Sequence, residues 1–144
     1  MSKPRIMIAE ARFYPDLADE LARGAIVVLE REEARYERIF VPGALEIPVA
    51  IALGERSGDF DGYITLGCVI RGQTSHYDIV AGQSARAIME LAIGRGLAIG
   101  NAILTVENKE QARARADRQG CDKGGMAART ALTMIDVKTQ LKRP

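Results

Sequence analysis

Short apolar runs and longer amphipathic stretches follow one another along the chain, which predicts alternating strands and helices. The runs are apolar at most successive positions, as expected of buried strands. They cover residues 5–9, 36–41, 62–70 and 98–105. Between them, apolar residues recur at the spacing of one helix face, most clearly at Leu17, Leu21, Ala25 and Leu29. Helices are therefore predicted from Pro15 to about residue 29, and over residues 45–53, 76–93, 109–117 and 125–138.

Proline and glycine mark the ends of these elements. Pro15 suits the first turn of its helix, and Pro48 is tolerated because it also falls in a first turn. Residues 54–61 are predicted to form a polar turn. Gly94 and Gly96 are predicted to end the third helix.

Alternation of helices with continuously apolar strands predicts an α/β fold with a parallel sheet buried on both faces. We expect a three-layer, flavodoxin-like arrangement, with a four-stranded parallel sheet flanked by helices on both faces. No repeat or linker divides the chain, so residues 1–144 are expected to form a single domain. Ligands bind such sheets beyond the carboxyl ends of the strands. The loops expected there are residues 11–13, 42–46, 71–76 and 106–108.

Charge and cysteine content exclude several classes of function. Twenty basic and 19 acidic side chains leave a net charge of +1, which argues against a nucleic-acid surface, and the basic C-terminal residues Lys138, Lys142 and Arg143 fit a solvated helix end. Two separate cysteines and one histidine make no common zinc set, and no metal is expected. Cys68 lies in an apolar run and is expected in the core. No signal peptide or membrane-spanning run is present, so a cytoplasmic location is expected and a membrane partner is not.

The only histidine, His76, follows the apolar strand of residues 62–70 through a short polar loop. Histidine has the side chain whose unperturbed pKa lies nearest neutrality, so it can accept and donate protons in catalysis. The same position also fits a surface histidine at a helix start with no further role.

Four other features could bind a ligand, and each has a structural alternative. Phe13 could stack on a planar ligand or plug a helix against the sheet. Glu46 could accept hydrogen bonds from ligand hydroxyls or simply favour the helix dipole. Residues 72–75 could hold an anion, or Thr74 or Ser75 could merely cap a helix. One arginine of residues 109–118 could clamp a phosphate, although spacing alone does not select it.

Together these segments resemble the lumazine synthase family over nearly the whole chain, in order and without large gaps. The resemblance is carried by residues 11–13, 41–48, 66–78 and 104–112, and by Lys123-Gly124-Gly125 with Ala127-Ala128. Residues 66–78 form its most specific part.

The resemblance implies a transferase of riboflavin biosynthesis. Family members join two small molecules, 5-amino-6-(D-ribitylamino)uracil and 3,4-dihydroxy-2-butanone 4-phosphate. An imine forms, phosphate leaves, the ring closes and water is lost, giving 6,7-dimethyl-8-ribityllumazine without a metal or organic cofactor. Two alternatives remain: an archaeal-type riboflavin synthase, which dismutates two lumazine molecules, and a non-catalytic flavin- or lumazine-binding protein. The intact residues 43–46 and 72–76 favour the condensing enzyme.

The resemblance also implies roles for individual residues. His76 would donate and accept protons, and Phe13 would stack on the pyrimidine. The ribityl chain would be held by Ala44, Leu45 and Glu46, the ring edge by backbone groups of Cys68, Val69 and Ile70, and the phosphate by Gln73, Thr74 and Arg115, with Lys123 adding positive charge. Asn101 departs from the family pattern, which often has a phenylalanine from the neighbouring subunit over the ring. Weaker pyrimidine binding is the expected consequence.

Family members are rings of five subunits with active sites between neighbours, and some build ten-subunit pairs or sixty-subunit shells. Only residues 1–4 precede the first predicted strand, whereas shell-forming relatives often have a longer N-terminal arm. An isolated homopentamer is therefore expected.

Overall fold

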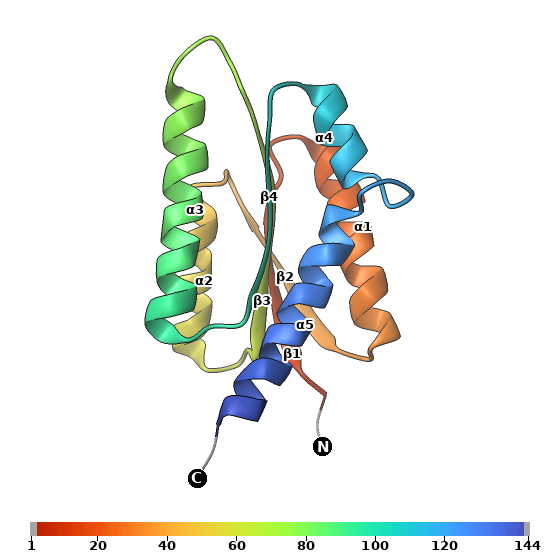
Figure 1. Ribbon diagram of the computed structural model, residues 1–144, viewed down its shortest axis with the longest axis vertical. Helices are drawn as coiled ribbons and strands as arrows, with labels where there is room; N and C mark the ends of the chain where they lie inside the picture. The colour runs from red at the N-terminus through yellow and green to blue at the C-terminus, as the bar shows by residue number, and fades with distance from the viewer. Residues whose placement is uncertain (1–2, 143–144) are drawn as a thin grey trace.

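The computed structural model describes residues 3–142 and contains one four-stranded parallel sheet with helices on both faces (Figure 1). The strands lie in the order β2-β1-β3-β4, and all three pairings are parallel. Their bounds are β1 Arg5–Ala11, β2 Arg35–Val41, β3 Gly62–Ile70 and β4 Ile99–Val106. The predicted three-layer α/β fold is confirmed. Met1 and Ser2 of the N-terminal segment, and Arg143 of the basic C-terminal end, lie outside the described residues.

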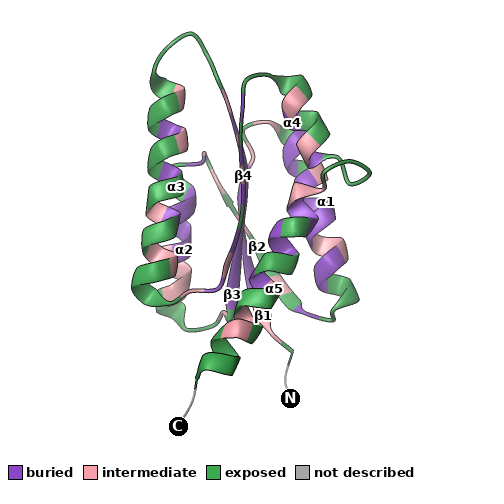
Figure 2. Cartoon of the chain, in the orientation of Figure 1, coloured by how far each residue is buried: buried purple, intermediate pink, exposed green. Residues whose placement is uncertain are grey.

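The helices divide between the two faces of the sheet (Figure 1). On one face lie α1 Pro15–Arg31, α4 Lys109–Ala116 and α5 Lys123–Leu141, and on the other α2 Glu46–Ser57 and α3 His76–Arg95. Each face has its own apolar cluster, and the even-numbered side chains Ile6 and Ile8 of β1 enter one while Met7 and Ala9 enter the other. Figure 2 shows the central strands buried and the outer sides of the helices exposed.

Four predicted helices end too early: α1 and α5 run on to Arg31 and Leu141, and α2 and α3 also extend past their predicted ends. The predicted polar turn at residues 54–61 is partly helix, because α2 continues through Gly54 to Ser57 and ends at Gly58, whose φ is +74°. A Cβ at Gly54 would lie 2.4 Å from the Met7 sulfur. The absence of a side chain at this position therefore allows α2 to pack closely on β1. Likewise α3 continues through Gly94, and only Gly96, with φ +63°, ends it.

Unequal strand lengths shape the carboxyl end of the sheet. The pairing of β1 with β3 ends at Glu10 opposite Leu66, whereas β3 pairs with β4 as far as Ile70. Residues 67–70 of β3 are thus paired with β4 only. This leaves one side of the β3 backbone free to meet a ligand.

No helix in the described part of the chain is both long enough and apolar enough to cross a membrane.

Candidate functional site

A cavity of about 450 Å³ lies at the carboxyl end of the sheet. Three of the four loops expected there contribute to it, together with the starts of α2 and α3. Its walls are Phe13, Tyr14, Pro42, Gly43, Ala44, Leu45, Glu46, Cys68, Val69, Ile70, His76 and Val80. Eight of the residues predicted for the site therefore meet in one place, although they come from segments far apart in the sequence.

His76 is the first residue of α3 and is exposed at the cavity. Its backbone N–H donates a hydrogen bond to Thr74 Oγ1 at 3.3 Å, so the Thr74 hydroxyl supports the start of the helix. Ser75 occupies the N-cap position without a side-chain capping bond. The contact with Thr74 uses the His76 main chain and leaves its imidazole available to a bound molecule.

Cys68, Val69 and Ile70 form the strand wall of the cavity, where β3 extends beyond β1. Cys68 was expected in the core, and it does pack against one of the apolar clusters of the sheet, but it is half-buried where this part of β3 borders the cavity. Burial, with a smaller contribution from the Asp16 charge, raises the pKa of the Cys68 thiol to about 11. The thiol is thus neutral near pH 7 and is unsuited to act as a nucleophile.

The segment before α2 turns sharply at the cavity rim. The Glu46 N–H donates to the Gly43 carbonyl at 3.1 Å, and the Ile47 N–H donates to the Ala44 carbonyl at 3.2 Å. Ala44 is buried in an apolar cluster with Val69 and Val80, while Leu45 and Glu46 are exposed. The Glu46 carboxylate is therefore free to accept hydrogen bonds from a ligand.

Phe13 does not plug a helix against the sheet, because 71% of its surface is exposed. Its ring meets the Tyr14 ring edge-on, with centroids 4.9 Å apart and planes at 75°. Tyr14 is half-buried, lines the cavity and packs against the core, a role that the sequence analysis missed. In the sequence, the only feature that could have indicated Tyr14 as a cavity residue was its position as a second aromatic residue next to Phe13.

Five of the predicted site residues do not line this cavity: Gln73, Thr74, Asn101, Arg115 and Lys123. Gln73 and Thr74 lie in the exposed loop just before His76. Arg115 belongs to α4 and Lys123 begins α5, both on the sheet face opposite α3 (Figure 1). The Asn101 carboxamide oxygen accepts hydrogen bonds from the Thr65 hydroxyl at 2.5 Å and from the Ile103 N–H at 3.1 Å, which tie it to the sheet.

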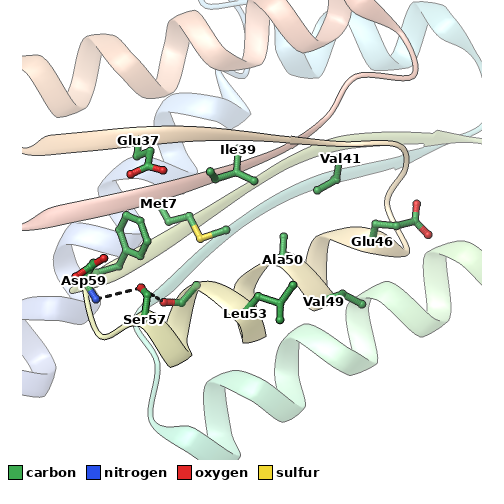
Figure 3. Close-up of a pocket in the computed structure, with 12 residues that line it drawn as sticks. Met7, Glu37, Ile39, Val41, Glu46, Val49, Ala50, Leu53, Ser57 and Asp59 are labelled. Carbon is green, nitrogen blue, oxygen red and sulfur yellow. Dashed lines mark hydrogen bonds between the residues drawn. The ribbon is translucent and has the colours of Figure 1, made fainter.

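A second cavity, also of about 450 Å³, lies between the edge strand β2 and helix α2 (Figure 3). Its walls are mainly apolar side chains: Met7, Ile39, Val41, Val49, Ala50, Leu53 and Phe60. Glu46 stands at one end and lines both cavities, and it is the only predicted site residue in the second one. Among the residues that the structure describes, no three His, Cys, Asp or Glu side chains lie close enough together to hold a metal ion.

Residues 3–139 match the family model described as 6,7-dimethyl-8-ribityllumazine synthase. A protein of that name from Agrobacterium fabrum is 56% identical over 146 residues, covering 98% of this chain and 99% of the relative. The protein of that name from Bartonella tribocorum is 55% identical, over 94% of this chain and 91% of its own. A 6,7-dimethyl-8-ribityllumazine synthase 1 from Rhizobium meliloti is 56% identical, over 94% of this chain and 92% of its own.

Proposed function

This chain belongs to the 6,7-dimethyl-8-ribityllumazine synthase family, and from that premise we propose that it is the condensing enzyme of riboflavin biosynthesis. It joins 5-amino-6-(D-ribitylamino)uracil to 3,4-dihydroxy-2-butanone 4-phosphate and releases 6,7-dimethyl-8-ribityllumazine, phosphate and water, with no cofactor. The observation that carries the proposal is the cavity in which Phe13, Glu46 and His76 converge. With both cysteines free, we also propose a cytoplasmic location.

The cavity supplies groups for each part of the pyrimidine substrate. The exposed Phe13 ring stacks on the planar ring, and the backbone of Cys68, Val69 and Ile70, unpaired on the β1 side, hydrogen-bonds the ring edge. The Glu46 carboxylate accepts hydrogen bonds from ribityl hydroxyls, beside Ala44 and Leu45. These contacts orient the substrate amine, which is already a competent nucleophile, towards the second substrate.

Catalysis then consists mainly of alignment and proton transfer. The amine attacks the ketone carbonyl and water leaves, forming an imine. Phosphate is eliminated, and ring closure releases a second water. His76, at the cavity end of α3, accepts and donates the protons that these steps move.

The phosphate binds at the start of α3, where main-chain N–H groups point outwards. Gln73 and Thr74 lie in the loop that leads into this helix. Arg115 and Lys123 complete the site from a neighbouring subunit, because within one chain they lie on the face opposite α3. Asn101 reaches the pyrimidine from the same neighbour, but as an amide it stacks less well than an aromatic ring.

The Arg115→Ala variant is expected to raise the apparent KM for the butanone phosphate by about tenfold to a hundredfold, through loss of a charge-assisted contact. In the described chain the Arg115 Nη1 donates only to the Gln111 carbonyl at 3.0 Å, so its guanidinium has donors to spare. Steady-state kinetics with each substrate varied in turn measures the effect. The exposed Arg113→Ala change on the same helix is the matched control and should leave both KM values unchanged. A defect confined to the pyrimidine substrate would refute the assignment.

A homopentamer fits the exposed apolar side chains of the face that bears α2 and α3. Val49 and Leu53 on α2, and Ile79, Met89 and Ile93 on α3, are each more than half exposed. Large exposed apolar side chains gathered on one face indicate a protein interface. If that face binds the opposite face of the next subunit, the head-to-tail contact closes into a ring.

Sedimentation equilibrium is expected to give a particle about five times the 15.7 kDa protomer mass. A monomer or dimer at micromolar concentration would contradict the ring. A particle of ten or sixty subunits would contradict the isolated pentamer.

Incubation with both substrates tests the proposed activity directly, because the lumazine product fluoresces. Appearance of product only when both substrates are present identifies the condensing enzyme. Riboflavin formed from lumazine alone would identify the archaeal-type riboflavin synthase instead. If the protein binds lumazine but never forms it from the two substrates, it is a carrier.

A further inference from the structure

A fully buried carboxylate lies beside the candidate site and has no part in the proposed chemistry. Glu10, on β1, has 0% of its surface exposed. Arg38 of β2 donates to both of its oxygens, from Nε at 2.6 Å and from Nη2 at 2.9 Å, and Arg12 Nη1 donates to Oε1 at 3.1 Å. A charge buried in a sheet is costly unless it is paired and hydrogen-bonded, and these two guanidinium groups meet that need.

Arg12 connects this carboxylate to the helix that follows. Its other terminal nitrogen, Nη2, forms an ion pair with Asp19 of α1. Its guanidinium also lies 5.5 Å from the centroid of the Phe40 ring. One planar side chain therefore clamps the end of β1 to the beginning of α1, and its fork geometry suits two carboxylates at once.

The loop that joins β1 to α1, residues 12–14, lies between these two anchor points, and Phe13 stands in its middle. Phe13 is 71% exposed, and its ring contact within the chain is the edge of Tyr14. Packing thus restrains the Phe13 ring little, and its position depends on the main chain on either side. A group held in its binding geometry beforehand loses less entropy when the ligand arrives.

We propose that Arg12 is a positioning residue, which fixes Phe13 over the pyrimidine ring by tying Glu10 to Asp19. The proposal rests on the proposed function, through the stacking role of Phe13. Arg12 itself need not touch either substrate.

The test measures the Kd of 6,7-dimethyl-8-ribityllumazine by fluorescence titration, and the KM of each substrate, in the intact assembly. Arg12→Gln removes the positive charge and the paired N–H donors of the guanidinium group. It is expected to raise the lumazine Kd and the pyrimidine KM about threefold to tenfold, as for loss of one aromatic contact. The KM of the butanone phosphate should not change. Equal increases in both KM values would overturn the proposal, because they indicate general damage to the site.

Arg38→Gln is the matched control. Arg38 makes the closer, bidentate contact with the same carboxylate and, like Arg12, lies near the Phe40 ring, 5.2 Å from its centroid. It stands on β2, however, and its removal leaves the bonds of Arg12 to Glu10 and Asp19 in place. This variant should lower Tm while leaving the lumazine Kd within about twofold of wild type, a change below the effect of one aromatic contact. A Kd raised as much as in Arg12→Gln would overturn the proposal.

A double-mutant cycle with Phe13→Ala separates positioning from direct contact. Phe13→Ala alone should weaken lumazine binding about tenfold or more, as stacking contacts of this kind do. Adding Arg12→Gln to it should change nothing further, because Arg12 then has no ring to position. Additive effects, or no effect of Phe13→Ala, would overturn the inference.

If Arg12→Gln does not fold, Asp19→Asn tests the same idea at an exposed position. It removes the helix-side anchor and should raise the lumazine Kd about twofold to threefold, with the butanone phosphate KM unchanged. An unchanged Kd would overturn the inference. Turnover by wild type is measured first: if no lumazine forms from the two substrates, the proposed function itself fails, whatever the variants show.

Discussion

The His76→Ala variant is expected to turn over about 10²–10⁴ times more slowly than wild type while still forming product. The imidazole lies at the cavity end of α3, and no other histidine exists in the chain to replace it. Residual activity should survive because the substrate amine is already nucleophilic, and because the cavity still aligns the two substrates. The loss should therefore appear in kcat far more than in the lumazine Kd.

Single-turnover kinetics with both substrates measures this effect. Gln83→Ala is the matched control, since Gln83 is an exposed residue of the same helix and does not line the cavity. It should keep kcat within about twofold of wild type, as surface substitutions usually cost little. A fully active His76→Ala variant would remove His76 from the mechanism, and a completely inert one would mean that alignment contributes nothing.

Gly100→Ala should be the most destabilising of the glycine substitutions, costing about 3 kcal/mol or more and lowering Tm by about 10 °C. Helix α5 crosses β4 at this point so closely that a Cβ on Gly100 would lie 1.8 Å from the Ala127 carbonyl oxygen and 2.6 Å from its carbon. Both are backbone atoms, which no change of rotamer can move. The helix would have to shift away from the sheet, and the contacts of Ala127 and Ala128 in the core would open.

Thermal unfolding followed by circular dichroism measures the effect, with Gly82→Ala as the control. Gly82 is an exposed residue of α3, and a Cβ there meets no atom within 4 Å. Alanine should stabilise that helix by up to about 1 kcal/mol. Equal stability of Gly100→Ala and wild type would show that α5 does not pack on β4 as the structure describes.

The residues of the candidate cavity could largely be found from the sequence, because they occur in compact segments. His76 follows its strand within a few residues, and Glu46 follows a proline and glycine that end another. Since all four strands run parallel, such segments must meet at one edge of the sheet. Tyr14 was not predicted as a cavity residue, because its local sequence pattern does not distinguish a residue that lines a cavity from one in the core.

Other features depend on contacts between distant residues. Gly54 resembles a helix end when only its neighbours along the chain are considered, yet it lies inside α2, where Met7 approaches too closely for a Cβ to fit. The hydrogen-bonded ion pair of Arg38 with Glu10 joins residues 28 positions apart, and no short sequence motif predicts it. The separation of Arg115 from His76 likewise depends on which face of the sheet each helix covers.

By itself, then, the amino-acid order determined the succession of strands and helices, the parallel sheet and the segments that bear the chemistry. These follow from periodicity and turn residues, which act over a few positions. Only the tertiary structure decided that β3 extends past β1 and exposes its backbone, that Arg12 joins a strand to a helix, and that Arg115 lies outside the cavity of its own chain. Strand register and packing between elements arise from long-range contacts, whose partners the local pattern does not specify.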